Sequence, residues 1–301
     1  MIGKLKGWNI GMKKVKIFVD TGADMPEALR KEYDIDIINY MCVFGETSYV
    51  AGVELTNEEF YEKLLASDKL PTTSQTPPAV IYDALSAAAK ENDSVVYITL
   101  SSKGSGQYSN AKMNAEAIME ENPDADIRII DSMSYSVYIS EAAICLRKLL
   151  NDGVELDAAI EKCKKVFEAY EAYVLVDTLK FLEKGGRITK TTAIVGSLLD
   201  IKPVLTIRNG LIEPLEKIRG KKKIYNKLVD LIKENPEFDD EAKEFCVIDS
   251  NSEYGDKLTE VLREEFEIDD IKRRYKFGPI IGTHIGNGAV AVLFRKKGYD
   301  L

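Results

Sequence analysis

The chain has 301 residues, of which 45% are hydrophobic and 30% are charged, a composition that excludes a disordered, collagen-like or disulfide-stapled polypeptide. Its 41 basic and 50 acidic residues give a formal net charge of −9, the wrong sign for a protein that coats nucleic acid or an anionic membrane. Any anion that it binds must therefore be held by a local group of donors.

The first half of the chain alternates between strand-like runs and helical patterns. Strands are expected at Val15–Asp20, at residues 94–100 and at residues 127–130. A capping box at Thr56 marks one helix start, and Thr76-Pro77 marks another with a cap hydroxyl and a proline. This alternation of strands and helices predicts a parallel sheet.

The pattern changes after an amphipathic helix whose apolar residues recur from Ile160 to Tyr170. Asn209-Gly210 separates two apolar runs, residues 204–207 and 211–215, and Asn-Gly in this position is a strong hairpin signal. Further strands are expected at residues 173–176, 246–249, 271–277 and 289–294. The second half therefore has antiparallel character.

These patterns predict an α/β protein of two α/β domains, the first with a largely parallel sheet and the second with a mixed sheet. An N-terminal extension covers residues 1–14, the N-terminal domain covers 15–165 and the C-terminal domain covers 166–301. We find no internal repeat and no low-complexity segment in the sequence.

The cysteine and histidine content argues against metal chemistry. The four cysteines have no C-x-x-C spacing and stand among apolar neighbours, which is typical of buried thiols in a reducing cytoplasm. They are Cys42, Cys145, Cys163 and Cys246. The single histidine, His284, rules out sites that need two histidine ligands. The start of the chain, at Met1 or Met12, lacks the apolar core of a signal peptide, so we expect a cytoplasmic protein without a metal or other cofactor.

Two clusters of hydroxyl side chains stand directly before predicted helices. Residues 72–76 precede a helix at 77–90, and residues 101–105 precede a helix at 107–119. The free N–H groups at a helix start bind phosphate or carboxylate without a formal cation, although Ser and Thr are also common helix caps. Consecutive β-α units place both clusters at the carboxyl edge of one sheet, so an anion site and simple capping both stay open.

His284 lies in a loop, residues 278–288, that contains four glycines. Glycine allows positive φ angles and close approach of the backbone to a ligand. With Ser105, His284 would form either a nucleophile and its base or two hydrogen-bond donors to an anion.

Basic residues gather in two segments of this acidic chain. Lys184-Gly185-Gly186-Arg187 follows a helical stretch, where a glycine pair and basic residues are typical of a helix C-terminus. Residues 217–223 carry five positive charges, and three of these are lysines at a predicted helix start, where they oppose the helix dipole. We therefore expect the second segment to serve a purpose other than helix stability.

Four short motifs occur in order along the chain. They are Pro71-Thr72-Thr73-Ser74-Gln75, Ser101-Ser102-x-x-Ser105-Gly106-x-Tyr108, Leu182-x-Lys184-Gly185-Gly186-Arg187-Ile188 and Gly278-Pro279-x-Ile281-Gly282-Thr283-His284. In this order they resemble the DegV family of bacterial fatty-acid-binding proteins, from about Val15 to the end of the chain. The sequence departs from the family pattern at Thr76, Gln107, Ile285 and Asn287.

The resemblance implies a lipid-binding protein that holds one long-chain fatty acid between two domains, with the carboxylate at the hydroxyl clusters. Thr73 or Ser74 and Ser105 would donate to the carboxylate, with His284 beside it. The implied fatty-acid-binding residues are Thr73, Ser74, Ser105, Gly106, Gly282 and His284. The resemblance also implies a non-enzymatic carrier that presents the fatty acid to a separate fatty acid kinase for phospholipid synthesis. Arg187 and Arg219 fall where the family has basic residues used with that kinase.

Two other classes of function stay open. The first is a serine hydrolase or acyltransferase that uses Ser105 and His284, with Asp20 or Asp249 as the orienting acid. The second is an enzyme that binds a nucleotide or sugar phosphate on residues 104–109, which match the dinucleotide fingerprint only in part. The net charge argues against nucleic acid as a partner, and the hydropathy argues against stable insertion into a membrane.

Overall fold

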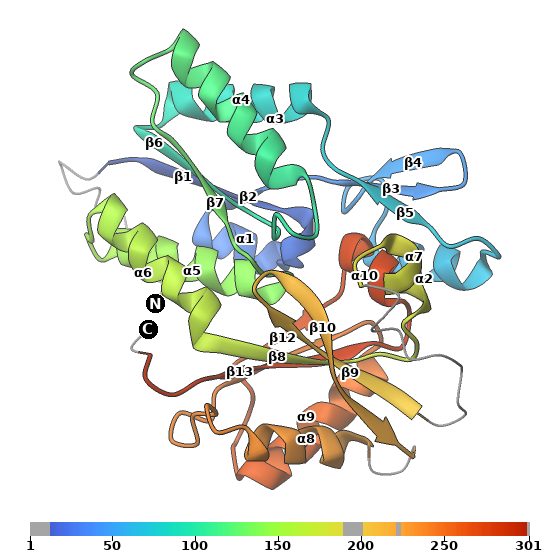
Figure 1. Cartoon of the computed structure of the whole chain (residues 1–301). Helices are drawn as coiled ribbons and strands as arrows, with labels where there is room; N and C mark the ends of the chain where they lie inside the picture. Colours follow the sequence, from blue (N-terminus) through green and yellow to red (C-terminus); the bar gives the residue numbers. More distant parts are fainter. Residues whose placement is uncertain (1–12, 189–200, 221–223, 300–301) are drawn as a thin grey trace, which may run out of the picture.

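The computed structural model describes residues 13–188, 201–220 and 224–299, and these form an α/β protein with two main sheets (Figure 1). The first sheet consists of four parallel strands in the order β2-β1-β6-β7. They are β1 (Val15–Asp20), β2 (Ile35–Ile38), β6 (Ser94–Thr99) and β7 (Ile127–Asp131). The strands β1, β6 and β7 lie within one residue of the predicted ranges, β2 was not predicted, and the predicted parallel sheet is confirmed.

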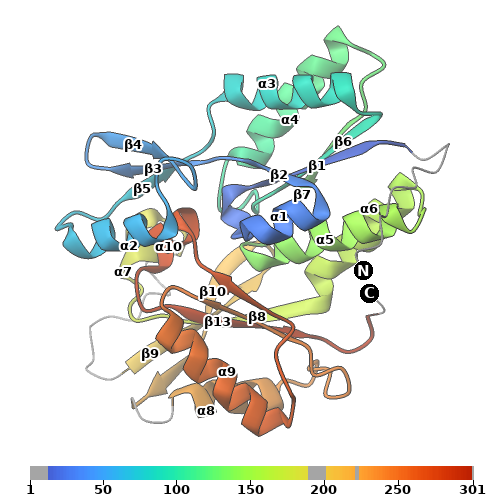
Figure 2. The ribbon, with the colours of Figure 1, turned by 180° about the vertical axis from the view of Figure 1, so that it is seen from behind.

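Helices cover both faces of the first sheet. They are α1 (Glu27–Tyr33), α3 (Pro78–Glu91), α4 (Gln107–Glu121), α5 (Val137–Asn151) and α6 (Leu156–Ala169). Because successive strand residues point to opposite faces, Phe18 packs with Leu85 of α3, whereas Ile17 and Val19 belong to the core that contains Ile139 of α5. Figures 1 and 2 show α3 and α4 on one side and α1, α5 and α6 on the other. Burial on both faces explains why these strands are almost continuously apolar.

The second sheet has six strands in the order β10-β9-β8-β13-β11-β12. They are β8 (Tyr170–Leu175), β9 (Ile201–Arg208), β10 (Leu211–Arg219), β11 (Phe245–Asp249), β12 (Arg273–Lys276) and β13 (Val290–Arg295). All neighbours are antiparallel except β11 and β12, so the predicted mixed sheet is confirmed. The predicted hairpin is β9–β10, with Asn209 and Gly210 at positive φ in its turn.

One hydrophobic core joins the two sheets. The helices α8 (Ile224–Glu234) and α9 (Ser252–Phe266) cover the outer face of the second sheet. The inner face contributes Ala172, Cys246 and Ile248 to the core that also holds residues of α5 and α6. The helices α5 and α6 therefore lie between the two sheets (Figure 1). No helix within the described ranges has the length and apolar character needed to span a membrane.

A small antiparallel sheet, which the sequence analysis did not predict, lies beside the two main sheets. Its strands, in the order β4-β3-β5, are β3 (Met41–Phe44), β4 (Thr47–Val50) and β5 (Thr72–Ser74). The remaining elements are η1 (Thr21–Ala23), α2 (Asn57–Ala66), α7 (Lys180–Gly185) and α10 (Pro279–Ile285). Three or four residues are too few for a strand to show alternation in the sequence, and pairing with neighbours stabilises these strands.

The predicted capping box at Thr56 is confirmed, because its hydroxyl accepts from the Glu59 N–H at 3.2 Å and Glu59 accepts from the Thr56 N–H at 2.9 Å. The expected cap at Thr76 is wrong. Its hydroxyl donates to the carbonyl oxygen of Asn39 at 2.8 Å, and Pro77 precedes α3 without a side-chain cap.

Two expectations about loops and one about a helix end are also wrong. Residues 72–74 form strand β5 because Thr73 pairs with Cys42 of β3, and the glycine-rich segment with His284 forms the helix α10. Pro279 at the first helical position favours that helix. The central helix α6 ends at Ala169, and Tyr170 begins β8. Residues 1–12 of the expected extension and residues 221–223 of the basic segment lie outside the described residues.

Candidate functional site

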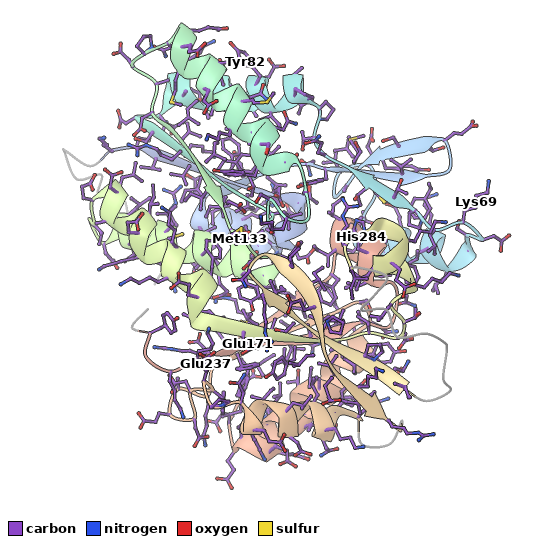
Figure 3. The ribbon with its side chains drawn as sticks, in the orientation of Figure 1. Lys69, Tyr82, Met133, Glu171, Glu237 and His284 are labelled. Atoms are coloured by element: carbon purple, nitrogen blue, oxygen red, sulfur yellow. The ribbon has the colours of Figure 1, made fainter. Side chains whose placement is uncertain are left out.

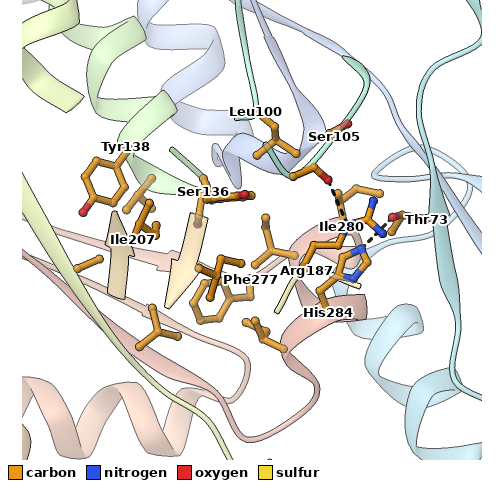
Figure 4. A pocket seen from close by; sticks show the side chains of 18 of the residues that line it. Thr73, Leu100, Ser105, Ser136, Tyr138, Arg187, Ile207, Phe277, Ile280 and His284 are labelled. Atoms are coloured by element: carbon orange, nitrogen blue, oxygen red, sulfur yellow. Dashed lines mark hydrogen bonds between the residues drawn. The ribbon is translucent and has the colours of Figure 1, made fainter. Parts of the chain in front are cut away.

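A cavity of about 360 Å³ lies where the first sheet, the second sheet and α10 meet (Figure 4). Most of its wall is apolar. The apolar lining includes Leu100, Ala172, Val174, Leu205, Ile207, Ile212, Ile248, Phe277 and Ala291. A chamber of this kind favours an aliphatic ligand, because the wall replaces water around each methylene group.

Polar side chains gather at one end of the cavity, where Thr73, Ser105, Arg187 and His284 lie (Figure 4). They come from β5, from the segment after β6, from the segment after α7 and from α10. Ser74 and Gly106 also line the cavity. The fold thus brings together residues from the four sequence motifs, separated by as many as 211 positions.

Gly282 and Arg219, two other residues singled out by the sequence analysis, lie outside the cavity lining. Gly282 faces α2, where an added Cβ would approach Phe60 Cε1 to 2.6 Å and Tyr61 Oη to 2.8 Å. This glycine therefore allows α10 to pack closely against α2. Arg219 is exposed at the end of β10.

His284 is hydrogen-bonded through its Nε2 to the hydroxyl of Thr73 at 2.9 Å (Figure 4). Its Nδ1 is buried and has no hydrogen-bond partner within the described parts of the chain. The ring lies against Gly185, where an added Cβ would be 2.3 Å from Nδ1. Gly185, which the sequence analysis interpreted as a helix stop, therefore also makes room for the imidazole.

Burial, and secondly the positive charge of Arg187, lowers the pKa of His284 to about 4. The imidazole is therefore neutral at physiological pH, with one ring nitrogen as donor and the other as acceptor. A neutral imidazole can donate one hydrogen bond to a carboxylate without forming an ion pair.

Because His284 is the chain's single histidine, its titration can be followed without interference. In tag-free, lipid-free protein we expect the imidazole Cε1–H resonance to stay constant from pH 8 to pH 5 and to shift only near pH 4. Since a bound carboxylate favours the imidazolium, adding ligand should raise this pKa. NMR spectra recorded across this range check both points, and a midpoint near 6.5 without ligand would show that the ring is solvated.

Ser105 is hydrogen-bonded to the phenol of Tyr40 at 2.7 Å. Its Oγ also accepts from the Gln107 N–H at 3.2 Å, at the start of α4. Ser105 therefore contacts the first N–H of α4 from the position before the N-cap, Gly106, which has no side-chain cap, and it also lines the cavity. Tyr40 carries no signal in the sequence, because only the pairing of distant segments places it beside Ser105.

Arg187 is half-buried in the cavity wall, although the sequence analysis assigned it to contact with a partner protein. Its Nε donates to the Gly104 carbonyl at 3.1 Å and its Nη1 donates to the Gly185 carbonyl at 2.5 Å. These two contacts fix the guanidinium at the polar end. The site therefore contains a formal positive charge, in addition to the neutral donors expected from the hydroxyl clusters.

The β9–β10 hairpin covers part of the cavity. The carbonyl oxygen of Gly210, at its tip, accepts from Ser101 Oγ at 2.8 Å and from the Tyr135 hydroxyl at 2.9 Å. Met133 lies close to the same turn (Figure 3). The hydroxyl of Ser101 thus holds the hairpin against the first sheet, which brings Ile207 and Ile212 into the cavity wall.

The geometry does not assemble the hydrolase site that the sequence left open. Within the described residues, the hydroxyl of Ser105 pairs with Tyr40 and no carboxylate orients His284 Nδ1. Asp20 accepts from the N–H groups of Gly22 and Leu100, and Asp249 forms ion pairs with Arg274 and Lys276. The described part of the chain also has no group of three or more His, Cys, Asp or Glu side chains arranged to hold a metal.

The fold and the cavity define an α/β protein with a largely apolar cavity that has polar side chains gathered at one end. A sequence model described as "Uncharacterised protein, DegV family" matches residues 14–297. The chain belongs to the DegV family.

Among its relatives, a DegV domain-containing protein of Clostridium perfringens is 32% identical over 286 residues, which cover 94% of this chain and 98% of that protein. The crystal structure of DegV from Bacillus subtilis, described as a fatty acid binding protein, has a TM-score of 0.81 at 29% identity and covers 95% of this chain and 100% of the other. A fatty acid binding DegV family protein from Streptococcus agalactiae also has a TM-score of 0.81, at 30% identity, covering 95% and 99%.

Proposed function

We propose that this protein binds one long-chain fatty acid, with the acyl chain in the apolar cavity and the carboxylate beside Thr73, Ser105, Arg187 and His284. The observation that carries the proposal is the placement of these four polar side chains at one end of a largely apolar chamber. An aliphatic chain with a terminal carboxylate has the same division of polarity. The two structural relatives described as fatty acid binding proteins support this function.

In this proposal the binding energy comes mainly from burial of the acyl chain of the fatty acid. Each buried methylene contributes roughly 0.8 kcal/mol, so about fourteen of them contribute ~11 kcal/mol before the cost of ordering the ligand. The carboxylate is stabilised by the charge of Arg187, by the Ser105 hydroxyl and by the Thr73–His284 pair, which has one donor hydrogen left because the other joins the two side chains. Both ends of the ligand therefore contribute to affinity.

We further propose that the protein acts as a cytoplasmic, non-enzymatic carrier that presents the carboxylate to a separate fatty acid kinase for phospholipid synthesis. In this proposal the ligand lies between the N-terminal unit, residues 15–165, and the C-terminal unit, residues 166–301. The exposed Arg219 contributes to the contact with the kinase. Formation of acyl phosphate from the loaded protein, a fatty acid kinase and ATP is the direct test of this step.

Mass spectrometry of lipid extracted from the purified protein tests fatty acid binding. We expect about one long-chain fatty acid per chain, because the buried methylenes oppose release during washing. Delipidated protein should take up added palmitate or oleate. Extracts without fatty acid, together with no uptake of either acid, would contradict the proposal, and turnover of an ester substrate would favour the hydrolase instead.

A further inference from the structure

Tyr138 lies at the end of the cavity opposite to Thr73 and His284 (Figure 4). It belongs to the first turn of α5, and only 3% of its surface is exposed. Val137 on the same helix and Ala172 on β8 line the cavity as well. The tyrosine ring is therefore part of the wall that a chain anchored at the polar end approaches with its methyl terminus.

The surroundings of the Tyr138 hydroxyl are polar. Burial raises the pKa of this hydroxyl, and the carboxylate of Glu171, on β8, raises it further. Glu171 in turn accepts from Thr206 Oγ1 at 3.3 Å and from Asn235 Nδ2 at 2.8 Å. A polar cluster formed by Glu171, Thr206 and Asn235 therefore borders the cavity, because Thr206 is part of its lining.

We propose that Tyr138 sets the maximum length of the acyl chain that this protein binds. This inference rests on the proposed function, because it requires the carboxylate at the polar end. Each additional methylene that finds an apolar wall raises affinity about fourfold. Once the acyl chain reaches the tyrosine ring, a longer acyl chain must displace the ring or fold back, and displacing a packed ring is costly.

The test compares wild-type protein with Tyr138→Ala and Tyr138→Phe. Each delipidated, full-length protein is titrated with saturated fatty acids from twelve to twenty-two carbons, and the length at which affinity stops rising is recorded. Removal of the ring in Tyr138→Ala should increase this length by at least two carbons and raise the affinity ratio of longer to shorter acids by tenfold or more. Tyr138→Phe keeps the ring and should keep the wild-type limit.

Two further variants keep the result interpretable. Leu85→Ala removes a buried side chain from the core between α3 and the first sheet, away from the cavity lining, and should leave the length limit unchanged. Ala172→Leu enlarges a residue at the same end as Tyr138 and should shorten the preferred chain, so it tests the inference even when Tyr138→Ala does not fold.

The outcomes separate the two proposals. Absence of fatty acid binding by wild-type protein would overturn the proposed function. Binding by wild-type protein with the same length limit in folded Tyr138→Ala would overturn the role of Tyr138 and leave fatty acid binding intact. If Tyr138→Ala does not fold, an unchanged acyl-chain length limit in Ala172→Leu would overturn the role of Tyr138 in the same way.

Discussion

Replacing Glu141 with alanine is expected to lower the free energy of unfolding by about 3 kcal/mol. Glu141, on α5, is 4% exposed and accepts from Arg273 Nη1 at 2.8 Å and from the Tyr275 hydroxyl at 2.6 Å, both on β12. It also lies 3.0 Å from Lys272 Nζ. Removal of the Glu141 carboxylate leaves the buried Tyr275 hydroxyl and the Arg273 guanidinium without their acceptor. Because the Arg273 side chain keeps 19% exposure, we expect the lower part of the 3–5 kcal/mol range.

Denaturant unfolding of Glu141→Ala beside Glu161→Ala checks this expectation. Glu161 forms an exposed ion pair with Lys164, and such pairs contribute about 0–1 kcal/mol. A loss of less than 1 kcal/mol in Glu141→Ala would mean that water replaces the carboxylate at low cost. The ion pairs of Glu141 with Lys272 and Arg273 link α5 to the second sheet. A large decrease in the free energy of unfolding would therefore show that this contact holds the two sheets together.

Replacing Arg187 with alanine is expected to weaken fatty acid binding by about 2–3 kcal/mol, or roughly 30- to 150-fold in Kd. The guanidinium is held at the polar end of the cavity by the carbonyl oxygens of Gly104 and Gly185. It is the formal cation among the four polar residues that gather there. Hydrogen bonds to a charged group cost more to remove than neutral ones, and the effect should exceed that of Ser105→Ala or Thr73→Ala.

Calorimetric titration of delipidated protein with a fatty acid measures this effect, with Lys184→Ala as the matched control. Lys184 belongs to the same motif but is exposed, so its removal should change Kd less than twofold. An Arg187→Ala protein with normal Kd and impaired phosphorylation by a kinase would instead support the role in partner contact that the sequence predicts for Arg187.

The parts of the fold that were correctly predicted are those with a local signature. The strands β1, β6 and β7 are largely apolar runs bounded by polar residues, and the β9–β10 hairpin contains Asn209-Gly210 at its turn. The sheet β4-β3-β5 lacked such a signature. Thr73 was interpreted as a loop residue because its strand consists of three residues and depends on pairing with Cys42.

The same distinction applies to the candidate site. Sequence motifs singled out Thr73, Ser105 and His284, which line one cavity, and also Gly282, which packs against α2. Tyr40 and Tyr138 carried no sequence signal, because a tyrosine next to a strand or in a helix is usually part of the core. Their places in the cavity depend on which distant segments surround them.

The α/β class, the parallel and mixed sheets and the hydroxyl and histidine motifs are predictable from the sequence, because hydrophobic period, turn residues and short motifs are properties of neighbouring positions. Tertiary contacts are needed to bring Thr73 to His284 across 211 positions, Arg187 into the cavity wall and Tyr138 to its far end. The physical reason is that burial, hydrogen-bond partners and charge at a site depend on contacts between distant segments, which form only when the core packs.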